Sequence, residues 1–128
     1  MIKVGDTLPA TTLQEYSEVE GEGCSIGPNP VDVSKATAGK TIALFALPGA
    51  FTPTCSAKHV PSFVSNFDAL KAKGVSEIVC VSVNDAFVME AWGKDQKAEG
   101  KIRMLADGNA EFSEALGLTF DASGFGMA

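Results

Sequence analysis

The chain has 128 residues, of which 45% are hydrophobic and 20% charged, and its net charge is −6. This size and apolar content indicate one folded domain, residues 1–128, and exclude a chain that is disordered throughout. The acidic balance, with Arg103 as the only arginine, excludes the basic surface that wraps nucleic acid. Apolar runs are shorter than a membrane span, and the first residues lack a signal-peptide pattern. We therefore expect a cytoplasmic protein that binds neither nucleic acid nor membranes.

Residues 1–40 are rich in turn-forming residues. Residues 1–13 have the pattern of an extended lead-in. Glycine and proline clusters at 21–23 and 27–30 predict turns, with a hairpin across them. Ser34 is a candidate N-cap for a short turn that ends at Gly39.

Strand and helix patterns alternate over residues 41–116, as is usual for α/β domains. The apolar run 41–47 predicts a strand buried on both faces, and the periodicity from 60 to 70 predicts a helix kinked near Pro61 and ended by Gly74. The other expected elements are a buried strand at 75–83, a helix at 85–97, a strand at 101–106 and a short helix at 109–116. This order predicts a three-layer α/β fold around a mostly parallel sheet.

Cys55 has the most distinctive position of the three cysteines. A proline-rich loop, 48–54, leads from a buried strand to Cys55 in the first turn of a helix. Open α/β sheets bind ligands at this end of their strands, and the helix N-terminus favours a thiolate. Thr52 lies three residues earlier, where its hydroxyl can turn back onto the sulfur, and Pro48 stiffens the loop. The alternative is that Cys55 is a small buried hydrophobe.

The other candidate side chains carry two interpretations each. Cys24 lies in a polar loop and Cys80 within a strand, and three unevenly spaced cysteines make neither a disulfide framework nor a zinc site. Cys80 is either a packed core thiol or a resolving cysteine that condenses with oxidised Cys55. His59 lies four residues after Cys55 on the same helical face, as a half-buried histidine or as a cation that assists the thiolate. Two such ligands do not make a metal site.

Three segments, in order, resemble blocks of the peroxiredoxin family. The pattern Pro48-x-x-x-Thr52-x-x-Cys55 matches the family's active site, and the longer segments are similar to its peroxiredoxin-5 (type II) subfamily. These segments are residues 48–56 with His59 and Pro61, residues 81–88 with Trp92, and residues 102–107. The motifs are specific, and the resemblance runs from Ile2 over nearly the whole chain.

The resemblance implies a thioredoxin-like fold and a thiol peroxidase that reduces hydrogen peroxide and alkyl hydroperoxides. Cys55 would be the peroxidatic nucleophile, which becomes a sulfenic acid. Thr52 would hydrogen-bond the peroxide and the sulfur, and Pro48 would shield the sulfenate. No metal or organic cofactor is expected.

The resemblance also implies partners. Phe51, His59 and Phe87 are similar to residues near the subfamily's hydroperoxide pocket and dimer contact, so a homodimer is expected; ordinary core packing is the alternative. The subfamily's C-terminal resolving cysteine has no counterpart here, and Cys80, although type II relatives carry a cysteine in this strand, is expected to be buried. We therefore expect reduction by glutathione with glutaredoxin, or by thioredoxin.

One departure from the family pattern concerns the C-terminus. Family members continue for several tens of residues, with two strands, a helix and an arginine beside the thiolate. Arg103 lies in a different block, and we interpret it as a structural cation. The domain is therefore expected to be incomplete at its C-terminus, with 41–47 as an exposed sheet edge. The alternative function is that of a catalytically poor thioredoxin-like fragment.

Overall fold

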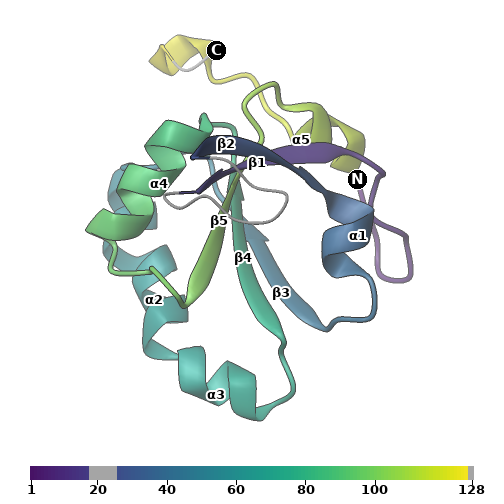
Figure 1. Ribbon diagram of the computed structural model, residues 1–128. Coiled ribbons are helices and arrows are strands. Elements are labelled where there is room, and N and C mark those ends of the chain that lie inside the picture. The colour runs from purple at the N-terminus through teal and green to yellow at the C-terminus, as the bar shows by residue number, and fades with distance from the viewer. Residues whose placement is uncertain (18–25, 127–128) are drawn as a thin grey trace.

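A computed structural model describes residues 1–17 and 26–126 of the chain. Five strands form one mixed sheet in the order β2-β1-β5-β4-β3 (Figure 1). The strands are β1 (Thr12–Ser17), β2 (Gly27–Asp32), β3 (Ile42–Ala46), β4 (Glu77–Ser82) and β5 (Ile102–Ala106). Strands β3, β4 and β5 are parallel to one another, and β1 pairs antiparallel with both β5 and β2. The predicted α/β sheet with flanking helices is therefore confirmed.

Helices cover both faces of the sheet, as the three-layer prediction requires (Figure 1). They are α1 (Val33–Thr37), α2 (Val60–Ser65), α3 (Phe67–Ala72), α4 (Ala86–Asp95) and α5 (Glu111–Leu116), with a π-turn at Cys55–His59 and a 3-10 turn at Ser123–Phe125. On one face Cys80 packs in a buried cluster with Val60 and Trp92 from α2 and α4. On the other face Val81 packs with Phe112 from α5. These two clusters form the core.

The carboxyl ends of the parallel strands lie at the same edge of the sheet, as the connections β3-α2-β4-α4-β5 require. The loop that carries Cys55 follows β3, and Asn84 follows β4 at the same edge. The hairpin reaches β5 there too, through the single register pair Gln14 and Ala106. The fold therefore gathers the candidate site at the carboxyl end of the sheet.

The predicted hairpin is confirmed, but the turn predicted at 27–30 is wrong. These residues lie in β2, where Pro28 pairs with Tyr16 and Pro30 with Gln14. β2 is an outer strand of the sheet. An outer strand tolerates prolines because every second N–H faces away from its partner. Cys24 and the turn predicted at 21–23 lie outside the described residues.

Two further expectations need correction. The N-cap of α1 is Asp32 and not Ser34, because the Asp32 carboxylate accepts the backbone N–H groups of Ser34 at 2.9 Å and Lys35 at 3.3 Å. Strand β3 is only partly buried, with Ala46 exposed, and was expected to be buried on both faces. Its position explains the difference, since β4 is the only described strand that pairs with β3.

The helix predicted after Cys55 is divided into α2 and α3 at Asn66. The Asn66 side chain donates to the carbonyl of Ser62 at 2.7 Å, and its backbone N–H donates to the same carbonyl at 3.1 Å. A short amide side chain that competes for helix carbonyls in this way favours a break. The apolar periodicity continues across the break, which is why the sequence pattern predicts one helix.

Candidate functional site

Cys55 begins the π-turn and is buried, with 7% of its surface exposed. Its carbonyl accepts the N–H of Val60, five residues on. Pro61 follows directly and has no N–H to give to the carbonyl of Ala57, so the regular α ladder cannot run through this point. The kink predicted near Pro61 thus takes the form of a π-turn, an irregularity common at functional sites.

The loop before Cys55 is fixed by its own hydrogen bonds. The Thr52 hydroxyl donates to the carbonyl of Gly49 at 2.7 Å, and the Thr52 carbonyl accepts the N–H of Ser56 at 3.0 Å. Thr52 therefore spans the turn from the loop to Cys55, and its hydroxyl oxygen keeps lone pairs to accept another hydrogen bond. Pro48, at the start of the loop, is exposed.

Asn84 ties the loop to the neighbouring strand. Its side-chain oxygen accepts the backbone N–H of Ala50 at 2.8 Å and the hydroxyl of Ser82 at 2.7 Å. Between Ala50 and Thr52, Phe51 has a φ of 62°, which is strained for a residue with a side chain. The sequence motifs did not single out Asn84 as a site residue. Its position directly after a buried strand, at the edge where α/β sheets bind ligands, is the sequence feature that indicates such a role.

Cys80 lies behind Cys55 in the same core cluster and is fully buried. Burial raises the pKa of the Cys80 thiol from 9.0 to about 12, with a smaller contribution in the same direction from its electrostatic interaction with the nearby Cys55 sulfur. Cys80 therefore stays protonated at neutral pH. Both cysteines are free thiols.

His59 belongs to an aromatic cluster beside the π-turn. Its ring centroid lies 5.0 Å from that of Phe45 and 5.8 Å from that of Phe63, and the two phenylalanine rings stack at 3.9 Å. His59 is half-buried, which fits the simpler of its two interpretations. Within the described parts of the chain, no three histidine, cysteine or acidic side chains are grouped to hold a metal ion.

The aromatic residues around the site divide into buried and exposed ones. Trp92 is fully buried, and its indole N–H donates to the Ser56 hydroxyl at 3.0 Å. Phe51 and Phe87 are 53% and 61% exposed, which is incompatible with ordinary core packing. Phe87 contacts the ring of Tyr16, with 5.7 Å between the ring centroids.

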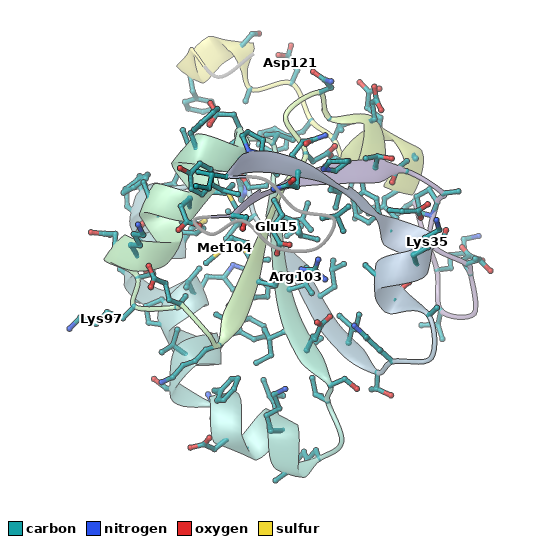
Figure 2. The ribbon with its side chains drawn as sticks, in the orientation of Figure 1. Glu15, Lys35, Lys97, Arg103, Met104 and Asp121 are labelled. Carbon is teal, nitrogen blue, oxygen red and sulfur yellow. The ribbon has the colours of Figure 1, made fainter. Side chains whose placement is uncertain are left out.

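Arg103 is engaged away from the Cys55 loop. Its guanidinium donates to the Glu15 carboxylate at 2.6 and 2.9 Å, joining β5 to β1, and lies 3.8 Å from Glu77. Figure 2 shows Arg103 and Glu15 together, where the hairpin diverges from β5. This pairing agrees with the interpretation of Arg103 as a structural cation.

The described helices are all too short, or too polar, to cross a membrane.

Comparison with known proteins decides the family. The family model described as Redoxin matches residues 3–128. Peroxiredoxin-2B of Arabidopsis thaliana is 44% identical over 126 residues, which are 98% of this chain and 74% of that protein. The chain belongs to the peroxiredoxin family. Another peroxiredoxin, Peroxiredoxin-2E, chloroplastic, of the same plant, is 52% identical over 120 residues, 94% of this chain but only 49% of that protein.

A solved peroxiredoxin structure supports the fold. Reduced Prx3 of Vibrio vulnificus in complex with H2O2 superposes with a TM-score of 0.89 at 52% identity, over 98% of this chain and 75% of that one. The thioredoxin-like fold of the peroxiredoxins, expected from the sequence, is thus confirmed. The family is one of thiol-dependent peroxidases, and the Cys55 loop is therefore the candidate active site.

Proposed function

We propose that this peroxiredoxin is a thiol-dependent peroxidase of the type II kind, with Cys55 as its nucleophile. The thiolate attacks one oxygen of the hydroperoxide, the O–O bond breaks, and the other oxygen leaves as water or an alcohol after taking up a proton. The sulfur is oxidised to a sulfenic acid and the peroxide is reduced. The observation that carries the proposal is the placement of Cys55, buried at the start of the π-turn, after a hydrogen-bonded loop at the carboxyl end of the sheet.

Two neighbours are assigned supporting roles. The Thr52 oxygen accepts a hydrogen bond from the peroxide, because its own proton is already donated to Gly49. Pro48 stiffens the entrance to the loop and shields the sulfenic acid from water. The solved Prx3 of Vibrio vulnificus holds H2O2, which supports hydrogen peroxide as a substrate here.

We propose that an external thiol reduces the sulfenic acid. A thiolate is the form that attacks an oxidised sulfur, and the pKa of about 12 keeps Cys80 in the thiol form. This disfavours Cys80 as a resolving cysteine. Glutathione with glutaredoxin, or thioredoxin, is the proposed reductant class, in a reducing cytoplasm where free cysteines persist.

We further propose a homodimer with Phe51 and Phe87 near its contact. Both rings are more than half exposed, and both lie at the carboxyl end of the sheet beside the Cys55 loop. Aromatic rings are enriched in protein interfaces, where their burial contributes much of the binding energy. His59, inside its aromatic cluster, is proposed to lie beside the place where the hydroperoxide binds.

The test of the proposed function compares two cysteine variants in a peroxide-consumption assay with dithiothreitol as the reductant. Cys55→Ser is expected to abolish consumption, whereas Cys80→Ser keeps it, because only Cys55 reaches the peroxide. Assays with glutathione plus glutaredoxin, and with thioredoxin, then identify the reductant. Equal loss of activity in both variants, or activity that survives in Cys55→Ser, would contradict the assignment.

A further inference from the structure

Trp92 is the only tryptophan of the chain, and it contacts the turn that carries the nucleophile. It lies on α4, fully buried, 36 residues from Ser56. Its indole N–H donates to the Ser56 hydroxyl at 3.0 Å. Ser56 directly follows Cys55, so this hydrogen bond joins α4 to the residue next to the reacting sulfur.

The same indole also contacts the other side of the turn. The ring of Phe51 lies 6.3 Å from that of Trp92, centroid to centroid, at 50°. Phe51 is the loop residue with the strained φ of 62°. Strain of this kind persists only where surrounding contacts hold the backbone in place. Trp92 therefore contacts residues four before and one after Cys55.

The hydrogen bond between Trp92 and Ser56 forms only while the π-turn keeps its position. A buried indole N–H has no access to water, so any movement that carries Ser56 away leaves it without a partner. An unsatisfied buried donor costs more than a hydrogen bond gains on the surface of a protein. The hydrogen bond therefore stabilises the one conformation of the turn in which Cys55 has the position described above. This is the conformation in which the sulfur reacts with the peroxide, so holding it in advance favours the reaction.

We propose that Trp92 is a positioning residue for Cys55 that acts through Ser56. By donating to Ser56, the indole holds the π-turn in its reactive geometry without touching the peroxide. The inference rests on the proposed peroxidase function and deepens it, because it names a residue of α4 that sets the reactivity of a sulfur on another element.

The experiment uses four single variants, one of them a control, and the double variant Ser56→Ala/Trp92→Phe. Ser56→Ala removes the acceptor, Trp92→Phe removes the donor but keeps an aromatic ring, and Ser56→Thr keeps the hydroxyl. Ser65→Ala is the matched control, since Ser65 is exposed on α2. The second-order rate constant for oxidation of Cys55 by hydrogen peroxide is measured on folded protein, together with the midpoint of thermal unfolding.

The expected result is a rate constant about fivefold lower in Ser56→Ala and in Trp92→Phe, the effect of one lost hydrogen bond. The double variant should lose no more than either single one, and Ser56→Thr should restore the rate. A purely structural role would lower the unfolding midpoint and leave the rate of the folded protein unchanged. That outcome, or additive losses in the double variant, would overturn the inference. Since Ser56→Ala is a mild change, the test stands even if Trp92→Phe does not fold.

Tryptophan fluorescence supplies a second readout. Because Trp92 is the only tryptophan, the emission comes from this indole alone and reports on its surroundings, which include the Ser56 hydroxyl. We expect oxidation of Cys55 to change the emission in the wild type, and the change to be smaller in Ser56→Ala. An unchanged emission in the wild type, in spite of oxidation, would contradict the coupling. A wild type whose Cys55 takes up no oxygen from peroxide would instead refute the proposed function, so the two failures are distinguishable.

Discussion

Thr52 serves the fold of the loop and, in our proposal, the binding of peroxide. Thr52→Val keeps the shape of the side chain and deletes the hydroxyl that donates to Gly49. We expect the rate constant with hydrogen peroxide to fall by roughly 2- to 13-fold, since the Thr52 oxygen accepts from a neutral peroxide and one such hydrogen bond contributes about 0.5–1.5 kcal/mol. Thr54→Val is the control, because Thr54 is exposed and makes no capping hydrogen bond. Unchanged rates in Thr52→Val would remove Thr52 from the site.

The buried thiol of Cys80 makes stability depend on pH at alkaline values. Its pKa is raised from 9.0 in the unfolded chain to about 12 in the fold. Folding therefore favours the protonated thiol, and this stabilisation is fully present below pH 9. It is lost as the pH rises from 9 towards 12, because the unfolded chain releases the proton first.

The corresponding measurement is the free energy of unfolding between pH 8 and pH 11, in urea. We expect the wild type to lose up to about 1 kcal/mol per pH unit more than Cys80→Ala, which has no thiol at this position. Parallel pH profiles for the two proteins would show that burial does not hold the Cys80 proton. Alkylation of the native protein near neutral pH should likewise spare Cys80.

At the scale of elements, Asn84 connects the Cys55 loop to β4. Asn84→Ala deprives both the Ala50 N–H and the buried Ser82 hydroxyl of their acceptor. We expect unfolding to become easier by roughly 1–3 kcal/mol, the cost of leaving buried polar groups unpaired, and the peroxide reaction to slow because the loop loses its anchor. The control is Asn109→Ala, at an exposed turn. Equal stability of the two variants would contradict this role.

The sequence predicts the elements of this fold well where a single pattern decides them. Buried strands β4 and β5 and the end of α5 at Gly117, with its φ of 72°, follow from apolar runs and a glycine C-cap. The sequence fails where tertiary position overrides local preference. Prolines read as a turn at 27–30 lie in an outer strand, and only the sheet order reveals which strand is outer.

The candidate site is predictable to the same degree. Cys55 and Thr52 follow from a local pattern of loop, helix start and family motif. The contacts of Asn84 with Ala50, and of Trp92 with Ser56, join residues 34 and 36 positions apart. Such pairings depend on how α4 and the turn before it pack against the loop, which no local periodicity encodes. The π-turn is also unpredicted, because proline indicates a break but not its form.

At the scale of the whole molecule, the exposed aromatic rings bear on assembly. If a second copy covers Phe87, then Phe87→Glu places a charge in a contact and is expected to shift the protein from dimer to monomer. Sedimentation equilibrium at micromolar concentration measures this. Val4→Glu, at an apolar residue that is fully exposed, is the control and should leave the dimer intact. A wild type that is monomeric at these concentrations would contradict the dimer proposal.

The central claim is that Cys55 takes one oxygen atom from a hydroperoxide, and mass spectrometry of the whole protein tests it most directly. Reduced protein is mixed with one equivalent of hydrogen peroxide, with no reductant present, and its mass and oxidised peptide are determined. We predict a gain of one oxygen atom on Cys55 in the wild type and in Cys80→Ser, with no gain in Cys55→Ser. Oxygen uptake at another residue, or an unmodified wild type, would contradict the account.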